Sequence, residues 1–140
     1  MKIGVFITRN LLGLMFVVFG LNGFLHFLPM PMPTGLAGQY MTVLSASHYM
    51  VPVFLLQILG GALLLANRYV PLGLVLLGPV IANILMYHAL MAPQGLPIAL
   101  IVTALFLVVF YSVRQAFAGI FAAQMHSEET GAVAPIGKLA

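Results

Sequence analysis

Four long apolar stretches constrain this chain more than any other feature. They run over residues 10–28, 50–66, 71–91 and 96–113. A helix rises 1.5 Å per residue, so each stretch is close to the ~20 residues that cross the ~30 Å hydrocarbon core of a bilayer. The sequence therefore predicts an all-α fold, a polytopic membrane protein built as a four-transmembrane-helix bundle.

Charge is too scarce in this chain to cover a surface that faces water. Only 5% of the 140 residues are charged and 63% are hydrophobic, whereas soluble domains carry about 25% charged residues. In lipid, backbone groups must be satisfied internally, which leaves helices or closed barrels. Barrel strands alternate apolar and polar residues over about ten positions, and these runs are continuous, so helices are expected. Five basic residues are also too few for nucleic-acid binding.

The domain organisation follows from where the apolar stretches end. We expect residues 1–124 to form the transmembrane domain, because the four stretches and the segments that connect them fill it. Residues 125–140 contain Glu128, Glu129, Gly131 and Pro135 and lack an apolar run. They predict a polar and mobile C-terminal tail. There is no cysteine, which excludes thiolate and disulfide chemistry by this chain alone.

The long first connection, residues 29–49, has its own pattern. After three prolines that alternate with methionine, apolar side chains recur at helical spacing at Leu36, Tyr40, Val43 and Leu44. This spacing predicts a short amphipathic helix in the outer loop, on the end of the bundle or in the headgroup region. An irregular loop is the alternative, since short periodic patterns are weak signals.

The five basic residues predict the orientation. Lys2 and Arg9 precede the first stretch, Arg68 lies between the second and third, and Arg114 and Lys138 follow the fourth. In a four-span arrangement all five fall on one side, which the positive-inside rule makes cytoplasmic. We therefore expect a multi-pass protein of the bacterial inner membrane with both termini in the cytoplasm.

Polar side chains inside the predicted spans suggest a ligand-binding site. Counted from the basic side, Asn22, Gln57 and Asn83 lie at similar depth, about 16–20 Å into their helices, and His26 lies one turn further out. Tyr87 is four residues from Asn83 and shares its stripe. Intramembrane polar groups are costly and often functional, so these five residues form the predicted site, with a quinone headgroup as the ligand considered.

The same amides have a second interpretation as packing groups. Asparagine and glutamine hydrogen-bond between transmembrane helices, at about 0.6 kcal/mol each on average. Small residues, such as the Gly60–Gly61 step and the pair Gly78 and Ala82, would let backbones approach closely. The sequence leaves both interpretations open.

The chain has few residues that could support catalysis or hold a tightly bound cofactor. The only carboxylate side chains, Glu128 and Glu129, lie in the tail, and no nucleophile and base have recognisable spacing, so no catalytic residue is assigned. His26 and His88 lie at matching depth, but no local motif accompanies them. We therefore expect no intrinsic cofactor and no metal site, and haem ligation by this histidine pair is not favoured.

Three segments resemble the DoxX-like family of small membrane proteins. They read RNLLGLMFVVFGLNGFLHFLPMP, LQILGGALLLANRYVPLGLVLLGPVIANI and GLPIALIVTALFLVVF, and the resemblance covers about residues 9–121. It implies four transmembrane helices and a place in a membrane redox complex, since the family's namesake is a subunit of a thiosulfate:quinone oxidoreductase. Many members carry a glutamate where this chain has Gln57.

Three functions are therefore compatible with the sequence. The resemblance implies an accessory or anchor subunit of a quinone-linked membrane complex, with other subunits and the lipid bilayer as partners. The lack of catalytic groups favours a structural or assembly protein that binds partner helices. A transporter of small solutes or lipids is the third, although no repeat and no charge within a span supports it.

Overall fold

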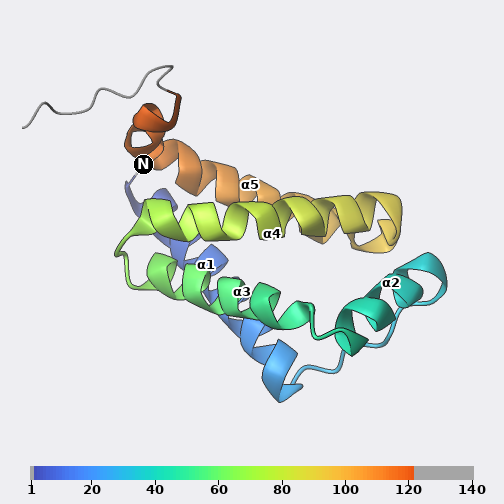
Figure 1. The fold of residues 1–140 in the computed structure, drawn as a ribbon. Coiled ribbons are helices and arrows are strands. Elements are labelled where there is room, and N and C mark those ends of the chain that lie inside the picture. Colours follow the sequence, from blue (N-terminus) through green and yellow to red (C-terminus); the bar gives the residue numbers. More distant parts are fainter. Residues whose placement is uncertain (1, 122–140) are drawn as a thin grey trace, which may run out of the picture.

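The computed structural model describes residues 2–121, and all of its regular elements are helices (Figure 1). In chain order they are α1 Lys2–Leu25, α2 Gly35–Ala46, α3 Met50–Leu65, α4 Val70–Leu90, η1 Pro93–Gly95, α5 Leu96–Ser112 and η2 Arg114–Phe121. The all-α prediction is confirmed for these residues. The predicted tail, residues 125–140, lies outside the described part of the chain.

Four helices form a closed ring. Helix α1 packs against α3 and α5, α3 packs against α4, and α4 packs against α5. The start of α1, the α3–α4 turn and the end of α5 meet at one end of the ring, whereas α2 and the α4–α5 turn lie at the other (Figure 1). Neighbouring helices in the ring therefore run antiparallel.

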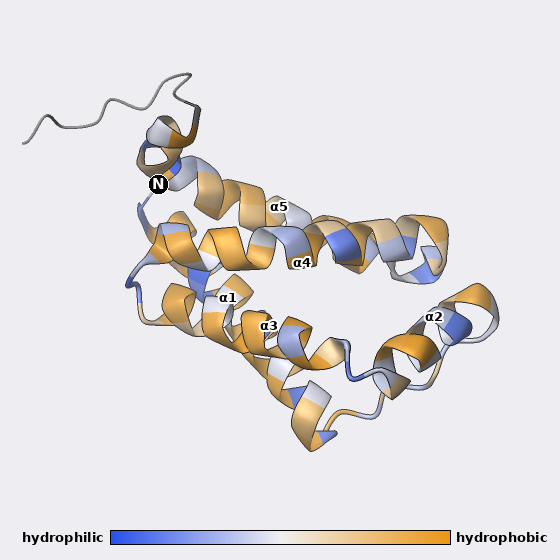
Figure 2. Cartoon of the chain, viewed as in Figure 1, coloured by the Kyte–Doolittle hydropathy of each residue, from blue (hydrophilic) through white to orange (hydrophobic). Residues whose placement is uncertain are grey.

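Three segments are long and apolar enough to cross a membrane. They are α1, α4 and the continuous segment Pro93–Ser112. Helix α3 has 16 residues and rises about 24 Å, less than the ~30 Å core. It passes the same test only together with α2, from which it is bent by 87°. The helices are apolar along most of their length (Figure 2), and the fold supports three or four spans.

The predicted helix bounds hold for three of the four stretches. Helices α3, α4 and α5 begin and end within one residue of the predicted ranges. Helix α1 instead begins eight residues earlier than residue 10 and ends three residues before residue 28. It ends early because His26 adopts a left-handed φ of 52°, a conformation that stops an α-helix. The earlier start places Arg9 inside the helix.

The short helix predicted in the first connection is present as α2. Tyr40 and Leu44 are half-buried on it, while Leu36 and Val43 are exposed. Helix α2 also contacts the segment that precedes it, at Pro33. A Cβ on Gly38 would lie 2.2 Å from the Pro33 carbonyl oxygen, so the backbone passes this glycine too closely for any side chain.

Glycines bring α1, α3 and α4 into close contact. A Cβ on Gly61 would lie 2.7 Å from the Gly13 oxygen of α1, and one on Gly60 would lie 2.6 Å from Leu77 of α4. Successive residues are about 100° apart around a helix, so this glycine pair lets α3 approach both neighbours. Gly78 was expected to be a site of close approach and is not one. A Cβ on Gly78 would lie 3.8 Å from its nearest neighbour, the Phe106 ring.

We expect Gly61→Ala to destabilise the bundle by about 1–3 kcal/mol, because the new methyl group meets backbone atoms that cannot move independently. Gly78→Ala is the matched control. It adds the same group to a helix interior with room for it, and should leave stability unchanged or raise it by about 0.5–1 kcal/mol. Thermal unfolding in a mild detergent measures both. Equal melting temperatures for the two variants would contradict the close contact.

Candidate functional site

Asn22 uses its amide within its own segment. Its side chain is buried, its Oδ1 accepts from the Leu28 N–H at 2.6 Å, and its Nδ2 donates to the Leu28 oxygen at 3.3 Å. The two bonds fold the chain back after the end of α1. The neighbouring His26 side chain is exposed. Asn22 therefore closes the end of α1 with groups that sequence reasoning assigned to a ligand.

Gln57 is buried between helices and lacks a full set of partners. Its side chain is 8% exposed, and a Cβ on Gly20 of α1 would lie 3.1 Å from its Cβ. Within residues 2–121, its Oε1 is the one fully buried side-chain polar atom without a hydrogen-bond partner. Leaving such a group unpaired costs about 1–3 kcal/mol. The amide therefore has an unused acceptor at the α1–α3 contact.

Asn83 and Tyr87 lie in a contact between α4 and α2. The Tyr40 hydroxyl donates to Asn83 Oδ1 at 3.5 Å, and the rings of Tyr40 and Tyr87 stack with centroids 5.8 Å apart. Asn83 itself is exposed. Tyr40 therefore connects α2 to α4, a contact that helical spacing within residues 29–49 could not predict.

His88 belongs to the turn between α4 and α5. Its Nδ1 lies 3.1 Å from the Ala92 oxygen, and a Cβ on Gly95 would lie 2.2 Å from its ring. The ring therefore fills the turn and uses one nitrogen there. Among residues 2–121, no group of three or more histidine, cysteine or acidic side chains is placed to hold a metal ion.

The five predicted ligand-binding residues are thus divided among separate contacts. Asn22 bonds Leu28, Asn83 bonds Tyr40, and neither amide bonds Gln57. His26 is exposed beyond the end of α1. Of the amides, Gln57 is the one that retains a buried, unused acceptor, so ligand binding by this set stays a prediction that centres on Gln57.

Arg9 is a functional candidate, although its place before an apolar stretch suggested only a flanking charge. It is 7% exposed, its Nη1 donates to the Leu64 carbonyl oxygen near the end of α3, and its guanidinium lies 5.7 Å from the Phe6 ring centroid. A cation at a helix C-terminus satisfies a carbonyl and complements the helix dipole. The spacing of Lys2, Phe6 and Arg9 on one helix stripe is the signal that could have suggested it.

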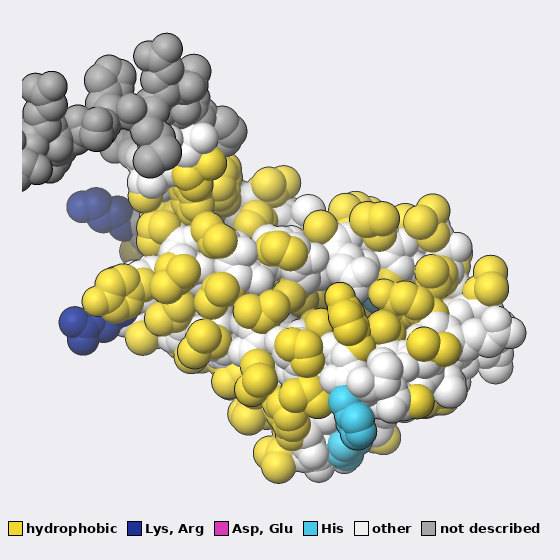
Figure 3. Space-filling model, in the orientation of Figure 1, with side chains coloured by type: hydrophobic (Ala, Val, Ile, Leu, Met, Phe, Trp, Pro, Cys, Tyr) yellow, Lys and Arg dark blue, Asp and Glu magenta, His cyan; other side chains and the backbone are white. Residues whose placement is uncertain are grey.

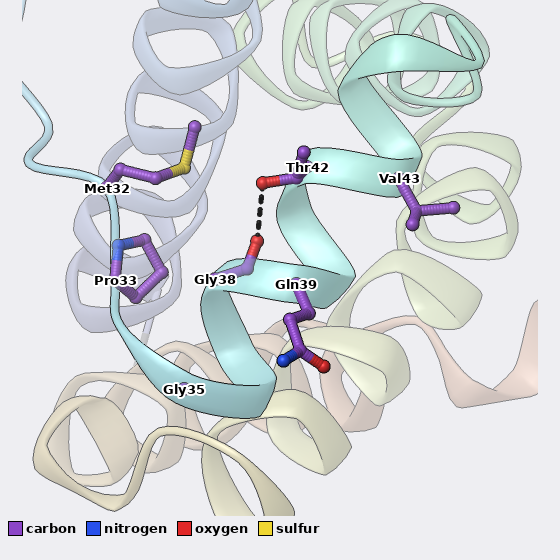
Figure 4. Close-up of a pocket in the computed structure, with 7 residues that line it drawn as sticks. All are labelled: Met32, Pro33, Gly35, Gly38, Gln39, Thr42 and Val43. Atoms are coloured by element: carbon purple, nitrogen blue, oxygen red, sulfur yellow. Dashed lines mark hydrogen bonds between the residues drawn. The ribbon is translucent and has the colours of Figure 1, made fainter.

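A hollow of about 480 Å³ lies between the proline-rich segment and α2 (Figure 4). Its lining residues are Met32, Pro33, Gly35, Gly38, Gln39, Thr42 and Val43. The lining contains no charged side chain, and the Thr42 hydroxyl already donates to the Gly38 oxygen at 2.8 Å. This hollow has little chemistry to offer a polar ligand.

No family model matches the chain, and none of the curated proteins or solved structures compared with it is similar to it. The resemblance to the DoxX-like family therefore rests on the three sequence segments alone, and what it implies is a proposal.

We expect Asn22→Leu to destabilise the protein by about 1–2 kcal/mol, because both polar backbone groups of Leu28 lose their partner. Asn83→Leu removes one long hydrogen bond from an exposed site, and should change stability by no more than about 0.5 kcal/mol. Thermal unfolding in detergent compares them. A larger loss for the Asn83 variant would show that the α2–α4 contact matters more than the closure of α1.

Proposed function

We propose that this chain is a four-span protein of the bacterial inner membrane with both termini in the cytoplasm. The basic residues of the described part, Lys2, Arg9, Arg68 and Arg114, belong to the end of the ring where α1 starts and α5 ends. On the face drawn in Figure 3, the dark blue basic side chains gather at this end. Because cytoplasmic segments are enriched in Lys and Arg, this distribution supports an even number of crossings.

A reporter enzyme that is active only in the periplasm tests this orientation. Fused to the C-terminus it should be silent, and inserted near Gly38 it should be active, because the α2 segment then lies on the outer side. In a three-span fold the C-terminal fusion would be active. A C-terminal signal equal to that of the Gly38 insertion would therefore exclude the four-span proposal.

We further propose that the protein is an accessory or anchor subunit of a quinone-linked membrane redox complex. The observation that carries this proposal is the unpaired Oε1 of Gln57, buried between α1 and α3. An amide presents both an acceptor and donors. It can therefore accept from a quinol hydroxyl and donate to a quinone carbonyl without a charge of its own.

The surroundings of Gln57 suit a flat, apolar ligand. Gly20 and Gly23 remove side-chain bulk from the facing side of α1, and the Phe54 ring fills the space next to Gly23. Phe54 also meets Phe24 edge to face, with centroids 5.7 Å apart. Aromatic walls with one polar group are typical of small-molecule sites.

Purification in a mild detergent, followed by solvent extraction and chromatography, tests the quinone. We expect quinone to co-purify with the unmodified protein and to be lost from Gln57→Leu, while the variant keeps its fold. Asn83→Leu is the control, since it removes an amide at the same depth and should retain the quinone. Loss from both variants, or from neither, would count against a site at Gln57.

A structural or assembly protein is the second candidate function. It is favoured by the close glycine contacts among α1, α3 and α4, since these three helices keep large apolar side chains such as Phe6, Leu55 and Leu72 on the outside. In that case Gln57→Leu should raise stability or leave it unchanged, because it removes an unsatisfied polar atom. It should not alter any bound small molecule.

A further inference from the structure

A second hollow, of about 220 Å³, lies at the basic end of the ring. Three parts of the chain contribute to it: the first turns of α1, the α3–α4 turn with the start of α4, and the end of α5. Its lining residues are Lys2, Val5, Phe6, Arg9, Asn67, Val70, Ser112 and Val113. The hollow therefore combines two cations and an amide with apolar walls.

Arg9 is a buried charge without an anion. Its side chain is 7% exposed and donates to one carbonyl oxygen, that of Leu64, whereas a guanidinium has five N–H donors. Residues 2–121 contain no aspartate or glutamate. A buried charge is costly unless it is paired and hydrogen-bonded. Within the described residues, this guanidinium lacks the carboxylate that would normally accompany it.

Lys2 lies on the same stripe of α1, seven residues before Arg9, and is exposed. Seven residues are nearly two turns, so Lys2 is about 10 Å from Arg9 along the helix axis, at the N-terminal end of α1. Asn67, which is exposed in the α3–α4 turn, adds an amide to the lining. The hollow thus has a buried cation inside and an exposed cation at its mouth.

We propose that this hollow binds the phosphate group of an anionic phospholipid from the leaflet that surrounds the basic end. A guanidinium group can donate two parallel hydrogen bonds to phosphate oxygens. Basic pockets between transmembrane helices bind lipid headgroups. A lipid is favoured over free phosphate because Val5, Phe6 and Val70 give the hollow apolar walls and because Ile3, Phe6 and Ile7 beside it are exposed. This site goes beyond the proposed function and needs neither quinone nor a partner subunit.

The test uses the full chain, stripped of lipid in a mild detergent, with dioleoyl-phosphatidylglycerol as the probe. Dioleoyl-phosphatidylcholine, which has the phosphate but no net charge, is the lipid control. We expect phosphatidylglycerol to raise the melting temperature, and native mass spectrometry to show one lipid retained per chain. Phosphatidylcholine should do so weakly.

Two charge variants make the test specific. Lys2→Gln should weaken phosphatidylglycerol binding roughly fivefold, the loss expected for one lysine near an anionic lipid. Arg68→Gln removes one positive charge from the same end but from outside the lining, and should leave binding unchanged. Arg9→Lys keeps the charge but loses the planar guanidinium and its paired N–H donors, so this variant should bind phosphatidylglycerol more weakly than the unmodified chain. If Arg9→Lys does not fold, the Lys2 and Arg68 pair still decides.

Three results would overturn the proposal. The first is an equal loss in Lys2→Gln and Arg68→Gln, which would indicate general surface attraction. The second is an equal rise in melting temperature with inorganic phosphate, which would make the free ion the ligand. The third is no effect of phosphatidylglycerol, together with a lower melting temperature when Glu128 and Glu129 are changed to glutamine, which would identify the tail carboxylates as the anion.

Discussion

The close approach of α1 and α3 at Gly13 and Gly61 is the contact on which the rest of this structure depends. Lipid tails are as apolar as leucine, so helices in a membrane associate through packing at small residues rather than through the hydrophobic effect. This approach also brings the end of α3 within reach of Arg9, whose guanidinium meets the Leu64 carbonyl 55 residues away. The neighbouring Gly60 lets α4 pack closely against α3, so that one pair of glycines joins three helices.

Most of the fold was predictable from local sequence, because the information for it is local. Apolar runs are sufficient to locate α3, α4 and α5 to within one residue. Pro52, Pro71 and Pro97 lie in the first turns of these helices, where proline is tolerated. The start of α1 was predicted wrongly, because a charge in an apolar stretch is normally a flank. Arg9 is buried inside the helix with the Leu64 carbonyl as its partner, and a one-dimensional pattern does not contain that partner.

The candidate site shows the same difference: the sequence predicts the depth of a polar side chain but not the group that it contacts. Counting along each helix gave the depth of Asn22, Gln57 and Asn83, but their faces and partners depend on how the connections fold. Asn22 turned to Leu28 because the chain reverses after His26, and Asn83 met Tyr40 because α2 folds back toward α4. Gln57 remains unpaired because its Cβ faces Gly20 of α1, and this glycine has no side chain that could form a hydrogen bond.

The short length of α3 has a consequence for the surrounding membrane. Helix α4 has 21 residues and α3 has 16, a difference of five residues or about 7.5 Å of rise. In a four-span arrangement the protein therefore presents two hydrophobic thicknesses to the lipid. Bilayers respond to such mismatch by thinning locally, and the thin region adjoins α3 at the end where α2 turns away by 87°. A bundle of this shape would act as a wedge, favouring shorter or more disordered acyl chains on one side.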